Sequence, residues 1–112
     1  MGVSTNIYTY YGVKIPYNEE LSESYDEVYN NPNVPDILFD GMSGEYIILG
    51  ERLYDSGDFR YDMEDGDTWK EIDIGMLPAY EILYKEKFAK FFPKLTHLLD
   101  KPFKLITFTH YH

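Results

Sequence analysis

The central stretch of the chain, residues 36–54, reads DILFDGMSGEYIILGERLY and decides the fold. Two apolar runs, at 36–39 and 45–54, flank residues 40–44, where two glycines are available for the positive φ angles that a tight connection requires. β-branched and aromatic residues dominate both runs, as pleated strands prefer. The stretch therefore predicts a β-hairpin in the middle of the chain.

The residues before this hairpin predict a strand followed by a helix. Residues 3–15 are rich in tyrosine, isoleucine and valine, and Pro16 ends the run. Asn18 is a suitable N-cap, and the helix dipole favours carboxylates such as Glu19 and Glu20 in the first turn. The expected amphipathic helix has about three turns and ends before Pro32. Its apolar residues are Leu21, Tyr25, Val28 and Tyr29.

The residues after the hairpin predict a long loop, a helix and a last strand. Residues 55–73 are acidic and rich in turn formers, with residues 69–74 as a candidate short edge strand. Pro78 suits the first turn of a helix, Pro93 interrupts that helix, and residues 94–99 add a further turn. Residues 103–111 predict the last strand. The apolar stripe of the helix is Leu77, Tyr80, Tyr84, Phe88, Phe91 and Leu95.

The element order is thus β-α-β-β-α-β within a single domain, residues 1–112, that carries a long acidic loop at about 55–73. This order is typical of the ferredoxin-like α+β fold, an antiparallel sheet of four strands with two helices on one face. The fold hosts many unrelated functions, so the function must be sought in particular residues.

Composition narrows the classes of function. The 112 residues carry a net charge of −10 and no cysteine, which excludes disulfides and thiolate zinc sites. Residues 1–77 hold 17 acidic and four basic side chains, whereas residues 78–112 hold three acidic side chains and six lysines. Such an acidic body disfavours direct binding to nucleic acids or anionic membranes and attracts a basic protein surface. Without a leader or a membrane-spanning run, we expect a cytoplasmic protein.

Carboxylates are concentrated in the first helix and in the acidic loop. Glu19, Glu23 and Glu27 follow each other at i, i+4 and i+8, where like charges repel. One helical turn, about 5.4 Å, is a spacing of the same order as that between phosphates of a nucleic-acid strand. The pattern predicts a polyanion mimic, and an acidic solubilising surface is the alternative. The predicted partner-binding residues are Glu19, Glu23, Glu27, Tyr61, Asp62, Glu64, Asp65, Asp67 and Trp69.

Two other interpretations concern the loop and the tyrosines. Placing Gly57 or Gly66 at the sixth position of an EF-hand loop leaves non-ligand residues at its first position, so we expect no metal site of that kind, and an irregular cation site is the open alternative. Six of the twelve tyrosines fall in residues 1–30. Along the first strand Tyr8 and Tyr10 share one face and Tyr11 lies on the other, and we expect the face that the helices leave uncovered to present aromatic side chains to a partner. Tyr61 and Trp69 are the expected anchors in the loop.

Catalytic motifs are missing from the sequence. There is no cysteine, no nucleophile-elbow serine and no glycine-rich phosphate loop, so we expect no enzyme and no cofactor. Of the three histidines, His110 and His112 lie close to the C-terminus, where an adventitious metal is the most that their spacing suggests, and His97 suits a helix end.

Two runs, residues 9–14 (TYYGVK) and 39–50 (FDGMSGEYIILG), resemble those of small tailed-bacteriophage proteins. The resemblance covers about the first half of the chain, transfers no site residue, and implies an inhibitor of a host enzyme or defence system, of the anti-CRISPR or anti-restriction kind. We therefore expect a non-enzymatic inhibitor that docks an acidic surface on the basic nucleic-acid-binding groove of a host nuclease or defence complex. The alternative is a structural or assembly protein that uses a tyrosine-rich sheet face.

Overall fold

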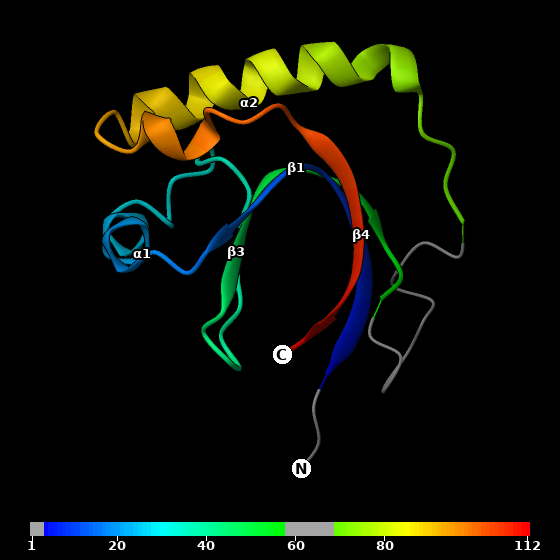
Figure 1. The fold of residues 1–112 in the computed structure, drawn as a ribbon, viewed down its shortest axis with the longest axis horizontal. Helices are drawn as coiled ribbons and strands as arrows, with labels where there is room; N and C mark the ends of the chain where they lie inside the picture. The colour runs from blue at the N-terminus through cyan, green and yellow to red at the C-terminus, as the bar shows by residue number, and fades with distance from the viewer. Residues whose placement is uncertain (1–3, 58–68) are drawn as a thin grey trace.

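The computed structural model describes residues 4–57 and 69–112. Figure 1 shows an arched sheet with a long helix across its outer side. The predicted α+β class is confirmed, and the predicted hairpin and both helices are present. The elements are β1 (Thr5–Pro16), α1 (Glu19–Asp26), β2 (Ile37–Phe39), β3 (Tyr46–Asp55), the 3₁₀ turn η2 (Ile74–Met76), α2 (Leu77–Phe91), the 3₁₀ turn η3 (Thr96–Leu99) and β4 (Lys104–Tyr111).

The four strands form one antiparallel sheet in the order β2-β3-β1-β4. Asp40 organises the turn between β2 and β3, because its carboxylate accepts hydrogen bonds from the backbone N–H groups of Ser43 (3.2 Å) and Glu45 (3.0 Å). Burial alone would raise the pKa of Asp40, but these hydrogen bonds hold it below its ordinary value. Gly44 supplies the positive φ of 63° that the turn needs.

The sheet is curled so strongly that its opposite corners meet. Tyr46 of β3 is in register with Pro16, and His110 of β4 is in register with Asn6, ten residues further back along β1. A straight strand of that length would separate the corners by roughly 33 Å. Instead, the Tyr46 hydroxyl lies 2.9 Å from Nδ1 of His110. The sheet is therefore an arch with a convex and a concave side (Figure 1).

The main core lies on the convex side, where both helices contribute to it. Leu21 of α1 and Tyr84 and Phe88 of α2 pack with sheet residues such as Val13 and Leu49. Asn18 caps α1 as predicted, since its side chain accepts a hydrogen bond from the N–H of Leu21 at 2.9 Å. Apolar burial on this side is the main source of stability for the arch.

The concave side carries a second, aromatic cluster that no helix among the described elements covers. Tyr8 and Tyr10 are 6% and 0% exposed, and Ile48 is equally buried. Phe108 and Tyr46 pack against them, with ring centroids about 6 Å apart, a distance typical of aromatic pairs. Among the described elements no further layer lies over these side chains, and the curl of the sheet removes them from water.

Three expectations require correction. The helix after β1 is shorter than expected: α1 ends at Asp26, and Glu27 is its C-cap. Residues 69–73 form no strand. Tyr8 and Tyr10 do not form a surface open to a partner, because the arch buries them. Within residues 4–57 and 69–112, no helix has both the length and the apolar character needed to cross a bilayer.

Candidate functional site

The acidic helix α1 is an open, highly charged surface. Glu19 and Glu23 lie on α1 and Glu27 follows at its C-cap, all three exposed to solvent. Only Arg52 and Lys85 form ion pairs with carboxylates among the described residues, and neither pairs with α1. The carboxylates of residues 19–27 are Glu19, Glu20, Glu23, Asp26 and Glu27.

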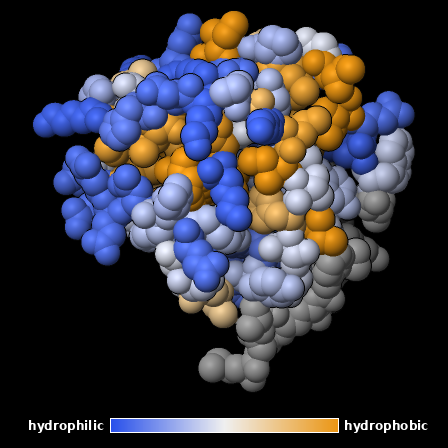
Figure 2. All heavy atoms as spheres, viewed as in Figure 1, coloured by the Kyte–Doolittle hydropathy of each residue, from blue (hydrophilic) through white to orange (hydrophobic). Residues whose placement is uncertain are grey.

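One cation approaches this surface without neutralising it. A shallow hollow of about 220 Å³ lies between α1 and the end of α2, and Glu20, Glu27 and Lys94 are among its lining residues. Lys94 forms no ion pair with either glutamate, because no described nitrogen–oxygen pair there lies within bonding distance. Figure 2 shows hydrophilic side chains gathered around the α1 end of the molecule. The carboxylates of α1 are therefore not neutralised by an ion pair with a described cation.

The other predicted binding residues are not brought next to α1 in the described part of the chain. Tyr61, Asp62, Glu64, Asp65 and Asp67 lie outside the described residues. Trp69 is described and is 73% exposed. However, β3 leads to the acidic loop from the end paired with Tyr8, whereas α1 follows the opposite end of β1. Figure 1 shows these two ends on opposite sides of the arch.

Sequence reasoning missed a polar cluster around Arg52. Its guanidinium lies 3.5 Å from the carboxylates of both Asp36 and Asp55. It also lies 5.1 Å from the centre of the Tyr8 ring and 5.9 Å from that of Tyr10, so it covers the open end of the aromatic cluster. Burial raises the pKa of Asp36, and the neighbouring guanidinium opposes that rise. Because Tyr8, Tyr10 and Asp36 are distant from Arg52 in sequence, no spacing rule could have grouped them with it.

The C-terminal histidines are bound into the sheet and are not loose chain ends. Nε2 of His112 lies 2.6 Å from the side-chain oxygen of Asn6, whose amide nitrogen donates to Asp55 at 2.8 Å. His110 is 3% exposed and stacks on His112 with ring centroids 5.3 Å apart. Within the described ranges, no group of three or more histidine, aspartate or glutamate side chains could hold a metal ion.

His110 makes the stability of the arch sensitive to mild acid. Burial, and after it the neighbouring His112, lower the pKa of His110 below 6.5, while Asp40 opposes the shift. The unfolded chain therefore takes up a proton at a higher pH than the folded chain. We expect the free energy of unfolding to fall as the pH drops from about 7.5 through about 6.5 toward the folded pKa.

Denaturant unfolding at several pH values measures this loss, and an NMR titration of the imidazole gives the pKa directly. His110→Phe keeps the ring packing and removes the titration, so its unfolding free energy should change less over the same interval. His97→Gln, at an exposed histidine, is the control. A measured pKa of His110 at or above the ordinary value would contradict the burial argument.

Comparison of the chain with protein-family models, with curated proteins and with solved structures found no match.

Proposed function

We propose that this protein is a non-enzymatic inhibitor that docks the acidic surface of α1 onto a basic, nucleic-acid-binding groove of a partner protein. The observation that carries the proposal is the set of exposed carboxylates on residues 19–27 with no cationic partner among the described residues. A solvated helix face ordinarily intersperses lysines with its glutamates, because like charges one turn apart repel. This segment contains none.

Electrostatics assigns the kind of partner. A surface of one sign accelerates association with a surface of the opposite sign and repels polyanions. At about 0.15 M salt the Debye length is roughly 8 Å, so the charges of α1 interact mainly with a surface that comes into contact with the helix. A groove that evolved to hold phosphates presents lysine and arginine side chains at the spacing of a nucleic-acid backbone, and the rows of carboxylates on α1 suit such a groove.

The cellular setting belongs to the same proposal. Inhibitors of host nucleases and defence complexes, of the anti-CRISPR or anti-restriction type, act on such grooves, and the two phage-like runs favour this class. The target and the inhibitor would then meet in the host cytoplasm. The predicted anchors Tyr61 and Trp69 and the carboxylates of the 62–67 segment would make a separate contact, since α1 lies at the other end of β1.

We also propose that the fold is the ferredoxin-like arrangement. Its support is the antiparallel pairing with β3 and β1 at the centre of the sheet, together with a core to which both helices contribute. The assembly alternative loses its main support, because Tyr8 and Tyr10 are buried in the arch and offer no tyrosine-rich face to another subunit.

Charge reversal on α1 tests the docking surface. In the variant Glu19→Lys, Glu23→Lys, Glu27→Lys we expect capture of nucleic-acid-binding proteins from a bacterial lysate to fall at least about tenfold at low salt. The wild-type protein should release the same proteins when duplex DNA or RNA is added. Quantitative mass spectrometry of the captured fraction measures both effects.

A matched variant separates location from total charge. Glu71→Lys, Asp73→Lys, Glu86→Lys reverses three exposed carboxylates outside α1 and its flanking residues, and changes the net charge of −10 by the same amount. We expect this variant to capture the same proteins nearly as well as the wild type. An equal loss in both variants would show that only overall charge matters, and the docking surface would then be rejected.

A further inference from the structure

A basic hollow lies where β1 and β4 separate. The last pair in register between these strands is Gly12 with Lys104. Beyond it, the chain leaves β4 through Pro102 toward η3 and opens a hollow of about 350 Å³. Its lining contains three lysines and no carboxylate, in a chain whose net charge is −10. The lining residues are Gly12, Val13, Lys14, Lys101, Pro102, Lys104 and Ile106.

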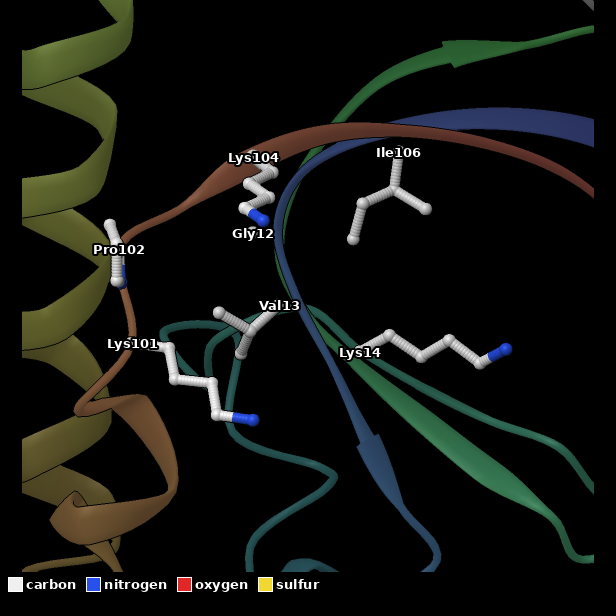
Figure 3. Close-up of a pocket in the computed structure, with 7 residues that line it drawn as sticks. All are labelled: Gly12, Val13, Lys14, Lys101, Pro102, Lys104 and Ile106. Atoms are coloured by element: carbon white, nitrogen blue, oxygen red, sulfur yellow. The ribbon is translucent and has the colours of Figure 1, made fainter.

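Two of the lysines are turned toward this hollow. In Figure 3 the side chains of Lys101 and Lys104 reach toward the space around Gly12 and Val13, whereas Lys14 runs away from it. Neither Lys101 nor Lys104 forms an ion pair with a described carboxylate. Gly12 lines the hollow with backbone atoms alone, and it is in register with Lys104.

The backbone adds an uncharged donor. Alternate residues of an antiparallel strand direct their N–H groups to opposite neighbours. The N–H of Ser4 donates to the carbonyl oxygen of His112, so the even-numbered residues of β1 direct their N–H groups toward β4, and the N–H of Lys14 faces this side beyond the end of β4. Pro102 stands there, and no backbone hydrogen bond joins it to Lys14. The hollow therefore offers two ammonium groups and one backbone N–H, the donors that bind an anionic head group.

A second hollow continues along the concave face. It measures about 310 Å³ and shares Lys14 and Ile106 with the first. Ile48, Phe108 and Tyr46 supply its apolar wall, and the Lys14 ammonium sits 5.1 Å from the centre of the Tyr46 ring. An apolar lining with a few charged groups at one end is typical of sites for small amphiphilic molecules.

We propose that these two hollows form one binding site for a small organic anion with an apolar body, such as a medium-chain carboxylate or an aromatic sulfonate. The anionic head lies between Lys101 and Lys104, and the apolar body crosses Ile106 toward Ile48 and Phe108. The site is independent of the docking surface on α1.

The test uses the fluorescent sulfonate 1-anilinonaphthalene-8-sulfonate as the probe. We expect saturable binding by the folded wild-type protein, with displacement by decanoate at lower concentration than by sulfate or decanol. Lys101→Gln, Lys104→Gln should raise the dissociation constant of the probe at least about fivefold. Lys70→Gln, Lys90→Gln changes the net charge equally at exposed lysines outside both hollows and should leave the constant within about twofold.

Ile106→Thr tests the apolar part of the site, and it should weaken the binding of decanoate more than the binding of sulfate. Circular dichroism of each variant establishes that it is folded. The proposal is overturned if the wild-type protein does not bind the probe saturably, if both double-lysine variants weaken binding of the probe equally, or if decanol competes as well as decanoate. Without saturable binding there is no site. Equal weakening by the two lysine pairs would mean that binding depends only on the overall charge of the protein, and equal competition by decanol would mean that the surface binds apolar chains without recognising an anion.

Discussion

Replacing Gly12 by alanine is expected to destabilise the arch by about 3 kcal/mol or more, a large part of the stability of a small domain. Gly12 and Gly50 face each other across β1 and β3 at the bend of the sheet. A Cβ atom on Gly12 would lie 2.0 Å from the backbone oxygen of Leu49, and one on Gly50 would lie 2.3 Å from that of Tyr11. These neighbours are backbone atoms, so they cannot move away without uncurling the sheet.

Guanidinium chloride unfolding of Gly12→Ala measures this cost, and Gly41→Ala is the control. No atom lies within 4 Å of a Cβ built on Gly41, so that variant should have unchanged stability or gain up to about 1 kcal/mol from the stiffer unfolded chain. A loss below about 1 kcal/mol in Gly12→Ala would mean that the strands do not approach each other as closely as described.

Replacing Tyr10 is expected to give the second large loss of stability. Its ring is fully buried between Tyr8, Phe108 and the sheet, so Tyr10→Ala should cost about 3–5 kcal/mol through the cavity it leaves. The hydroxyl group of Tyr10 is expected to contribute little to stability, in contrast to the ring. It is buried and makes no hydrogen bond of good geometry with a described residue, and burial followed by the nearby Asp36 carboxylate raises its pKa. Tyr10→Phe should therefore be neutral or stabilising by up to about 1 kcal/mol.

Tyr84 provides the comparison for the hydroxyl. It is also buried, but its hydroxyl donates to the backbone oxygen of Asp36. Tyr84→Phe leaves that oxygen without its donor and should cost about 1–2 kcal/mol. Denaturant unfolding of the two phenylalanine variants decides the matter. Equal losses in both would show that the hydroxyl of Tyr10 is in fact satisfied in the folded protein.

Local signals were sufficient to predict the elements. Asn18 caps α1 and Pro78 lies in the first turn of α2, and both signals depend on only a few neighbouring residues. The turn-forming residues 40–44 likewise predicted the hairpin. α1 ends early because Leu21 is its only fully buried residue, so tertiary packing holds little beyond its first two turns. Periodicity alone extended the helix too far.

The curl of the sheet could not be predicted from the sequence. It depends on Gly12 and Gly50 meeting across two strands, and on Tyr46 meeting His110 across the arch. Each of these pairs is far apart in the chain, and neither glycine has a local pattern that marks a crossing. The same reason explains why Tyr8 and Tyr10 were expected at a surface. It also explains why Lys101 and Lys104 could not be associated with Lys14.

The candidate site was predicted in part. The exposed carboxylates of α1 follow from composition and helical spacing, which the sequence contains. Their distance from the entry to the acidic loop follows from the topology, because α1 and the loop leave opposite ends of β1. The sequence could therefore group Glu19, Glu23 and Glu27 with one another, but it could not show where they lie relative to the entry of the loop.

The most direct test of the docking account is the affinity for a captured nucleic-acid-binding partner, measured for the wild type and both charge variants from about 50 to 500 mM salt. We predict a steep fall in the wild-type affinity across this range, competition by duplex nucleic acid, and a selective loss in Glu19→Lys, Glu23→Lys, Glu27→Lys. Binding that is indifferent to salt, or equally weakened by Glu71→Lys, Asp73→Lys, Glu86→Lys, would contradict the account.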